Sequence, residues 1–320
     1  MKKLILPSAI LLLTSVILIT VNSCKKKTET KTEDPAAPIS TTSNVDQFFT
    51  SNAASIQVYT INSATLQTIT GIKGTVISIP KNAFVVASTN SAVTSGTVEI
   101  SLQEIYSKKD MILNMAQTVS GNDFLESGGE INITAKQGTN TLKMAPGKKI
   151  SISMPTPPTP STAMRTFYGN VNTAGQMNWA LNTNSTAIVA NTSSSVSYYT
   201  FYADSLHWIN CDAILCMSCP LVSYSVNISG AFDKNNTRIV TVFPSINGMM
   251  SLYPYTNSPQ TYYGSSKLPN PSNAVVVAIS EIGGQYYSAF QTLSVTPSAV
   301  YNLTMTPTTT TQIVTQLNAL

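Results

Sequence analysis

Beyond residue 55, apolar and polar residues alternate along much of the chain. In residues 98–103, Val, Ile and Leu alternate with Glu, Ser and Gln. This alternation has a period of two residues, as in a strand with one buried face. Similar segments recur between turn-forming Gly, Pro and Asn residues, and Gly283-Gly284 predicts a hairpin turn into a strand that begins near Tyr286. They predict strands at residues 75–79, 98–102, 131–135, 149–154, 198–203, 206–209, 222–228, 238–243, 274–280 and 301–305. This pattern predicts an all-β protein.

Four prolines among six residues interrupt the strands at Pro155–Pro160. Because proline removes a backbone donor and favours an extended spacer, we place a domain boundary there. We therefore expect two β-sandwich domains of the Ig-like kind. The expected order is a sandwich over 51–155, a Pro/Ser/Thr-rich linker with short strands over 156–200, a second sandwich over 201–306, and a Thr-rich tail with a short helix over 307–320.

The first 23 residues have a different pattern. A basic start, Met1–Lys3, precedes an apolar run from Leu4 to Val21, and small residues lead to Cys24. This layout predicts a secretory signal peptide over 1–23, with Cys24 acylated and converted to the new N-terminus. The alternative is an uncleaved membrane anchor, but the run is near the lower limit for a span and Pro7 interrupts it. In both cases the lipid bilayer is an expected partner.

Residues 24–50 begin with a charged segment and contain few apolar side chains, so we expect a flexible tether there. Residues 1–34, which cover the leader and the start of the tether, hold six of the 18 basic residues and three of the 14 acidic residues. The rest of the chain therefore carries a net charge of only +1. A nearly neutral body lacks the basic surface that nucleic-acid binding requires, so nucleic acid is not an expected partner.

Several strand-and-turn segments resemble a known family. Residues 74–84, residues 96–100 and the Gly128-Gly129 pair look like parts of ZU5-type β-sandwich modules, and the segment 208–212 is similar to one in uncharacterised lipoproteins of Bacteroidetes-type bacteria. The resemblance implies a sandwich fold and an outer-membrane lipoprotein, and it brings no catalytic residues. Lys25–Lys27 differ from the acidic run that surface-exported lipoproteins of these bacteria carry after the cysteine. That difference favours a periplasm-facing position over the cell surface.

One cluster contains the only histidine and every cysteine other than Cys24: His207, Cys211, Cys216 and Cys219. Three thiolates and an imidazole could form a tetrahedral zinc site. Export to an oxidising compartment instead favours one structural disulfide among the three cysteines. A redox role for Cys216 and Cys219 is a further alternative, although no helix is evident to lower the pKa of the attacking thiol.

No set of residues predicts catalysis. The sequence has no Gly-x-Ser-x-Gly elbow, no phosphate-binding glycine loop and no Asp-rich calcium loop of the usual spacing. Two carboxylates suffice for glycoside cleavage, which leaves open a cluster of acids in the first domain. Its members are Glu99, Glu104, Asp110, Asp123, Glu126 and Glu130. Because alternation places Glu99 on an outer face and Asp110 and Asp123 in turns, we expect no enzyme and no cofactor.

Four tyrosines, Tyr253, Tyr255, Tyr262 and Tyr263, lie in a Pro/Ser/Asn-rich region. They could stack on sugars or contact a protein, or pack at a strand edge. We therefore expect a membrane-anchored lipoprotein that acts as a non-enzymatic binding or structural component of the cell envelope, with another envelope protein or a glycan as partner. A carbohydrate-processing protein and a Cys3His metal or redox protein are the alternatives.

Overall fold

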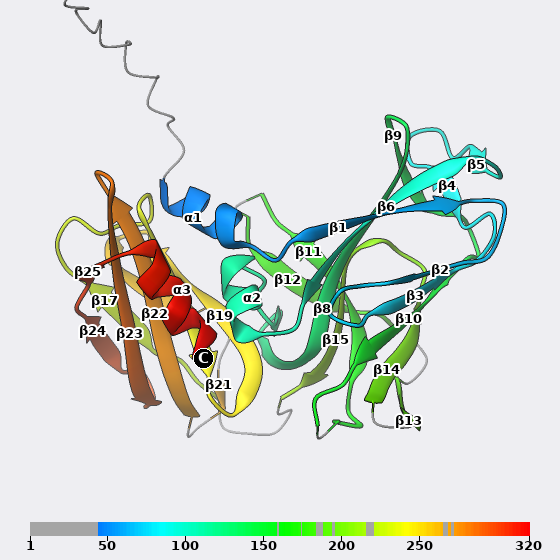
Figure 1. The fold of residues 1–320 in the computed structure, drawn as a ribbon. Helices are drawn as coiled ribbons and strands as arrows, with labels where there is room; N and C mark the ends of the chain where they lie inside the picture. Colours follow the sequence, from blue (N-terminus) through cyan, green and yellow to red (C-terminus); the bar gives the residue numbers. More distant parts are fainter. Residues whose placement is uncertain are drawn as a thin grey trace, which may run out of the picture. The chain divides into compact units, whose positions relative to one another are not determined.

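Strand β6 (Thr97–Ile105) shows how the alternation becomes structure. In the computed structural model, Val98, Ile100 and Leu102 are fully buried while Glu99 is exposed. The structure describes residues 44–320 except residues 159, 174, 184–187, 194–195, 216–220, 265–267 and 270–271. Most described residues lie in strands that form sandwich-like layers, which confirms the all-β fold class (Figure 1).

Two sheets pack face to face in the first half of the described chain. The larger runs in the order β12–β11–β15–β8–β9–β4–β5, while β6 and β7 also pair with β8, and β1 pairs with β6. Its strands are β1 (Ile56–Asn62), β4 (Phe84–Val86), β5 (Ala92–Val93), β6, β7 (Val119–Ser120), β8 (Asp123–Gln137), β9 (Asn140–Met144), β11 (Arg165–Val171), β12 (Met177–Leu181) and β15 (His207–Ile214). The smaller sheet has the order β13–β14–β10–β3–β2. Its strands are β2 (Gln67–Thr70), β3 (Val76–Ile79), β10 (Ile150–Pro155), β13 (Val189–Ser193) and β14 (Val196–Ala203).

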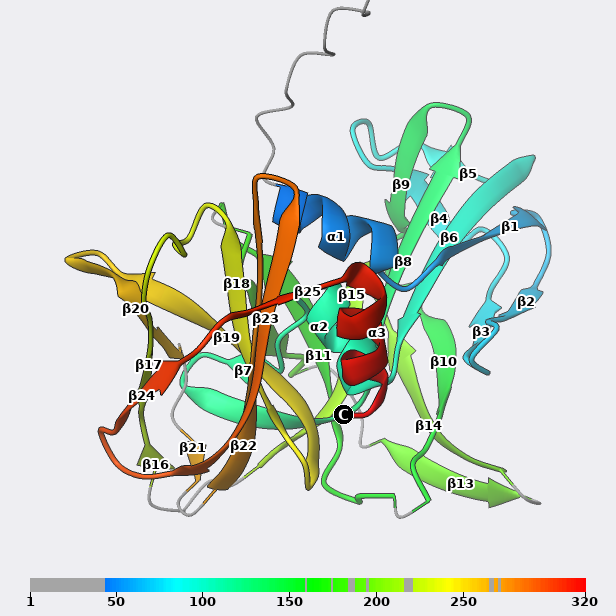
Figure 2. The ribbon, with the colours of Figure 1, turned by 60° about the vertical axis from the view of Figure 1, so that its left-hand side comes forward.

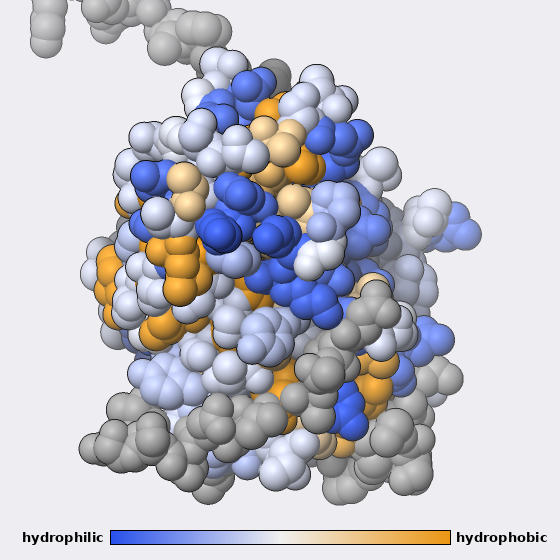
Figure 3. Space-filling view, turned by 90° about the vertical axis from the view of Figure 1, so that its right-hand side faces the viewer, coloured by the Kyte–Doolittle hydropathy of each residue, from blue (hydrophilic) through white to orange (hydrophobic). Residues whose placement is uncertain are grey.

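The inner faces of these two sheets form one hydrophobic core. Ile100 and Ile133 of the larger sheet pack in the same cluster as Ile77, Ile152 and Phe201 of the smaller sheet. On the outward face of this half, apolar side chains occur in separate patches among hydrophilic ones (Figure 3). Scattered exposed apolar residues of this kind are normal for a folded protein and indicate no docking surface.

A second large sheet curls around its own core in the order β24–β17–β20–β19–β18–β22–β23–β25. Only β17 and β24 pair in parallel, among the described strands of this sheet. A tight turn with positive φ at Gly283 and Gly284 joins β22 to β23, as the sequence predicts. The strands are β17 (Ser225–Ile228), β18 (Thr237–Phe243), β19 (Ile246–Tyr255), β20 (Ser258–Gly264), β22 (Ser272–Ile282), β23 (Gln285–Val295), β24 (Val300–Leu303) and β25 (Thr306–Thr308). Separately, β16 (Leu221–Val222) pairs with β21 (Leu268–Pro269).

Three helices, α1 (Asn44–Asn52), α2 (Lys108–Leu113) and α3 (Thr310–Asn318), lie between the two β regions (Figures 1 and 2). Phe48 of α1, Ile112 of α2 and Ile313 of α3 belong to one buried cluster, which also contains Val242 and Ile279 of the eight-stranded sheet. Residues 42–320 accordingly form one compact unit. The short C-terminal helix predicted from the sequence is present as α3.

The expected boundary at Pro155–Pro160 does not separate the sheets. Strands β11 and β15, from the expected linker and second domain, pair with each other, and β15 also pairs with β8; β14 pairs with β10. The first sandwich therefore extends to Ile214, and the change of sheet comes between β15 and β17. The prolines end β10 without ending the domain, because the chain returns to the same two sheets.

The expected tether also ends earlier than residue 50. Residues 44–52 form α1, in which Val45, Phe48 and Phe49 are buried at helical spacing. Residues 24–43 and the predicted signal peptide lie outside the described residues. No helix within the described part of the chain is long and apolar enough to span a membrane.

Candidate functional site

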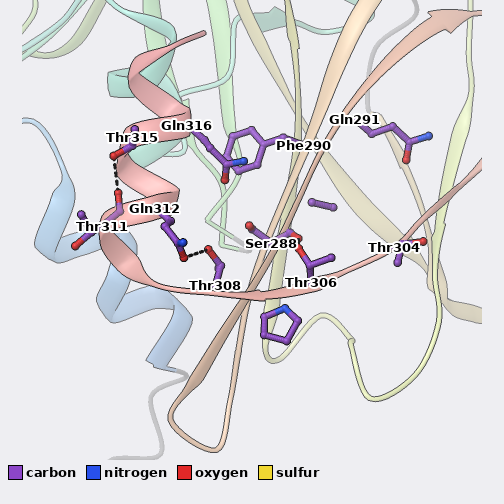
Figure 4. A pocket seen from close by; sticks show the side chains of 12 residues that line it. Ser288, Phe290, Gln291, Thr304, Thr306, Thr308, Thr311, Gln312, Thr315 and Gln316 are labelled. Atoms are coloured by element: carbon purple, nitrogen blue, oxygen red, sulfur yellow. Dashed lines mark hydrogen bonds between the residues drawn. The ribbon is translucent and has the colours of Figure 1, made fainter.

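A groove of about 680 Å³ runs between α3 and the strands β23 and β25 (Figure 4). α3 forms one wall, β23 the other, and β25 passes between them. Its volume lies within the range of pockets that hold small ligands, roughly 300–1,000 Å³. The residues that line it are Ser288, Ala289, Phe290, Gln291, Thr304, Thr306, Pro307, Thr308, Thr311, Gln312, Thr315 and Gln316.

Local sequence fixes the wall formed by α3. The side chain of Thr309 accepts a hydrogen bond from the Gln312 backbone N–H, and the Gln312 side chain accepts one from the Thr309 backbone N–H. This capping box starts the helix after the Thr-rich run. Ile313 and Leu317 are then buried against the sheet, which leaves Thr311, Thr315 and Gln316 available to the groove.

The chemistry of the lining is uniform. None of the twelve lining residues is charged: six carry hydroxyl groups, three carry amides, and Phe290 supplies an aromatic ring. Hydroxyls and amides both donate and accept hydrogen bonds. The groove therefore suits a neutral ligand that has many hydroxyl groups and one apolar face.

Part of this polar lining is free to bind a ligand. Thr306 Oγ1 donates to the Ser288 carbonyl at 3.2 Å, Thr308 Oγ1 donates to Gln312 Oε1 at 3.2 Å, and Thr315 Oγ1 donates to the Thr311 carbonyl. By contrast, the side chains of Thr304, Gln291 and Gln316 make no hydrogen bond with any described residue. Gln291 lies on β23, Thr304 in the connection between β24 and β25, and Gln316 on α3, so the three groups come from different sides of the groove (Figure 4).

The four tyrosines predicted as ligand contacts come together only in part. Tyr253, Tyr262 and Tyr263 line a second pocket of about 540 Å³, together with Lys234 and Arg238. Tyr255 is not among its lining residues; its ring stacks on Tyr263 with centroids 4.3 Å apart. Tyr262 differs from the others because it is buried in the core, and burial raises its pKa to about 12.

Arg238, one of the two cations that line this pocket, is already paired. Its guanidinium lies 2.6 Å from Asp46 Oδ1 and so joins β18 to α1. This ion pair reduces the positive charge that the pocket offers to a ligand. The tyrosine pocket is therefore an aromatic site with one cation, Lys234, that has no ion-pair partner among the described residues.

The acidic residues considered for glycoside cleavage are dispersed by the structure. Glu99 is exposed on β6, as the alternation predicts. Glu104 is buried and accepts hydrogen bonds from the Lys73 and Thr75 backbone N–H groups at 2.8 and 3.0 Å. Asp110 is in the α2 capping box, and Asp123 starts β8 in a hairpin. Glu126 and Ser127 both line a pocket of about 450 Å³.

Glu130 has a companion that the sequence pattern did not reveal. It is fully buried near Asp212, which lies in β15, and burial together with the charge of the other carboxyl raises the pKa of Glu130. Burial also raises the pKa of Asp212. The two residues are more than 80 positions apart in the chain, and only the pairing of β8 with β15 brings them together.

The cysteine cluster is described only in part. Cys211 is free and fully buried in the first core, and burial followed by the nearby charge of Asp212 raises the pKa of its thiol. His207, at the start of the same strand, is exposed. Cys216 and Cys219 lie outside the described residues, so the disulfide expected among the three cysteines stays a prediction. Among the described residues, no group of three or more His, Cys, Asp or Glu side chains is placed to hold a metal ion.

Comparisons with known proteins found no match for this chain. No protein-family model matches the chain, and no curated protein or solved structure matches it either.

Proposed function

We propose that this protein is an exported lipoprotein, anchored in the outer membrane through acyl chains on Cys24, that binds a neutral glycan without processing it. The observation that carries the proposal is the uncharged groove beside α3, with its hydroxyls, amides and Phe290. The leader before Cys24 supports the location, and the resemblance to Bacteroidetes-type lipoproteins with a ZU5-like module is in keeping with it.

The lining favours a glycan over a charged ligand on energetic grounds. An ion that enters a partly dehydrated groove loses hydration energy, and it needs an opposite charge to recover that energy. No such charge is present among the groove residues. A sugar instead exchanges water for neutral hydrogen bonds and can place its C–H face on an aromatic ring.

An extended peptide is the competing ligand. β25 pairs with β23 only at Tyr286–Ser288, so the remainder of β23 up to Val295 has no strand on that side among the described residues. A peptide could add to such an edge as a further strand. We favour the glycan because the free side-chain groups, Gln291, Thr304 and Gln316, come from three different segments of the chain rather than from the strand edge alone.

Binding to an array of neutral oligosaccharides, followed by calorimetry on each hit, tests the proposal. Gln316→Ala and Phe290→Ala should each weaken binding by about tenfold or more, which corresponds to about 1.4 kcal/mol. Gln316→Ala is the decisive variant because the side chain does not hydrogen-bond to the rest of the described protein. Tyr263→Ala, outside the groove, is the matched control and should bind as the wild type does.

Three results would contradict this function. Loss of binding in Tyr263→Ala but not in Gln316→Ala would move the site to the tyrosine pocket. A blank glycan array with binding of neutral peptides from a display library would replace the glycan by a peptide. For the anchor, Cys24→Ala should release the protein from washed membranes; retention of that variant would contradict lipidation at Cys24.

A further inference from the structure

A group of buried oxygen atoms lies on the outer face of the first sandwich, away from its core. Residues directly opposite each other in an antiparallel pair have side chains on the same face. Asn210 lies opposite Glu130, and Asp212 lies opposite Ser127, across β15 and β8. Asn132, two residues from Glu130 along β8, shares this face.

An irregularity in the sheet brings the two carboxyl groups together. Between the pairs Asn210–Glu130 and Asp212–Ser127, β8 contains one residue more than β15. The extra length falls at Gly128-Gly129, where Gly129 has a φ of +133° and an added Cβ would lie 2.3 Å from the Tyr106 ring. Only glycine fits this bend. The bend therefore shapes the strand at the point where Glu130 and Asp212 approach each other.

Most of these oxygens have nothing to bind. Both carboxyl oxygens of Glu130, Oδ1 of Asp212 and Oδ1 of Asn132 are buried without a hydrogen-bond partner among the described residues. Glu130 and Asp212 are themselves completely inaccessible to solvent. All four atoms are acceptors when the acids are charged, so they cannot satisfy one another. Buried polar atoms left in this state are rare and costly.

The neighbouring side chains of Asn210 and Ser127 already donate hydrogen bonds to other acceptors than these four oxygens. The Asn210 amide N–H₂ donates to Asp212 Oδ2, and Ser127 Oγ donates to Asn210 Oδ1 at 3.3 Å. These bonds orient Asp212 but leave its other oxygen free. No Lys or Arg forms an ion pair with either acid in the described part of the chain.

We propose that Glu130, Asp212 and Asn132 bind a calcium ion in the interior of the molecule, through the four oxygens that lack a partner. Two carboxylates neutralise a divalent ion, and an all-oxygen set suits a hard cation rather than zinc. Calcium is preferred over magnesium because the site is closed to solvent, and magnesium gives up its water molecules reluctantly.

The site lies where an ion would stabilise the whole unit. α2 lies between strands β8 and β15 and the eight-stranded sheet (Figure 1). The Asn247 amide of β19 donates a hydrogen bond to the Ser127 carbonyl at 2.9 Å. This bond joins the eight-stranded sheet to β8 next to the cluster. A pocket of about 450 Å³ is lined by Ser127 and Gly128, two residues of the same strand as Glu130.

The competing explanation is that the two acids hold protons. Burial raises the pKa of both carboxyl groups, and the charge of Asp212 raises the pKa of Glu130 further. Neutral acids would carry no charge into the interior. The two explanations predict opposite responses to calcium. With a cation site, calcium stabilises the protein; with protonated acids, it has no effect.

Calorimetry with CaCl₂ on the full-length protein, after treatment with EDTA, tests the proposal. We expect about one calcium ion per chain, a higher Tm with calcium than with EDTA, and much weaker binding of MgCl₂. Terbium bound in place of calcium should luminesce on tryptophan excitation, because Trp208 lies opposite Asn132. Glu130→Gln, which preserves the shape of the side chain, should weaken calcium binding more than about tenfold.

Asp123→Asn is the matched control, because this acid is on the same strand but exposed at its start, away from the cluster. It should bind calcium as the wild type does. Absence of calcium binding by the wild type overturns the proposal, as does a Glu130→Gln variant that binds calcium normally. A rise in Tm of Glu130→Gln in EDTA, with no response of the wild type to calcium, would instead establish the protonated pair. If Glu130→Gln does not fold, the wild-type stoichiometry and the terbium signal still decide.

Discussion

Lys73 Nζ lies 2.6 Å from Asp110 Oδ2, and this ion pair joins the turn before β3 to the first turn of α2. Asp110 also accepts a hydrogen bond from Ser107 Oγ at 2.7 Å within the capping box of α2. Burial alone would raise the pKa of Asp110, but the hydrogen bonds from Lys73 and Ser107 and the charge of Lys73 outweigh it and lower that pKa. The carboxylate form thus stabilises the junction between the smaller sheet of the first sandwich and α2.

The pKa of Asp110 predicts how stability depends on pH. A carboxyl with a folded pKa below its unfolded value, near 4, stabilises the protein above that unfolded value and ceases to do so as the pH falls through the folded pKa. Asp110→Asn should therefore lower the free energy of unfolding by about 1 kcal/mol at pH 7 and by less at acidic pH. Urea unfolding at both pH values measures the difference. Asp123→Asn, at an exposed acid, should change it by less than about 0.5 kcal/mol; an equal loss in Asp110→Asn at both pH values would contradict the prediction.

Two glutamates of one strand provide a sharper comparison. Glu104 is buried and accepts hydrogen bonds from Gln57 Nε2 at 2.8 Å and from the Lys73 and Thr75 backbone N–H groups. Glu104→Ala would leave the buried Thr75 donor and the part-buried Gln57 and Lys73 donors without their acceptor, and a buried donor left in this way costs about 1–3 kcal/mol. We therefore expect a loss of about 3 kcal/mol or more in denaturant unfolding. Glu99→Ala, on the exposed face of β6, should cost less than about 0.5 kcal/mol; similar losses in both variants would refute the role of Glu104.

The alternation of residues predicted the strands well because it depends only on neighbouring positions. It placed Glu99 outward and Val98, Ile100 and Leu102 inward, and Gly283-Gly284 indicated the hairpin that joins β22 to β23. Alternation says which face a residue occupies, however, and not which strand it pairs with. The partnership of β8 with β15, and with it the approach of Glu130 to Asp212, was therefore beyond reach of the sequence.

The groove could not be predicted for a related reason. Its walls come from β23, β25 and α3, and its Ser, Thr and Gln side chains look like ordinary solvent-facing residues in the sequence. Tyrosines attracted the prediction instead because aromatic residues are conspicuous, and one of them, Tyr262, is a core residue. Helix α1 was assigned to the tether because it directly follows a polar segment. The helical spacing of Val45, Phe48 and Phe49 was the signal that indicated it.

The packing of α1 predicts that it is part of the folded body. Phe48 is 2% exposed, and its ring lies 5.7 Å from that of Tyr286 in β23. Phe48→Ala should cost about 3–5 kcal/mol in the free energy of unfolding, as for other large aromatic residues removed from a core. Thr50→Ala, on the exposed side of the same helix, controls for helix propensity and should cost less than about 1 kcal/mol. A Phe48→Ala variant as stable as the wild type would show that residues 44–52 belong to the tether after all.

The environment of Cys211 predicts its reactivity. Its thiol is free and fully buried, and burial with the charge of Asp212 raises its pKa, so very little thiolate is present near neutral pH. Iodoacetamide should leave Cys211 unmodified in the folded protein and alkylate it in urea without any reductant, as peptide mass spectrometry would show. If Cys211 in urea reacted only after reduction, it would be in a disulfide with one of the other cysteines. If Cys211 is alkylated while Cys216 and Cys219 require reduction first, the disulfide expected from export joins those two. The same result would exclude a Cys3His zinc site, because all three of its thiolates would react once the protein is unfolded.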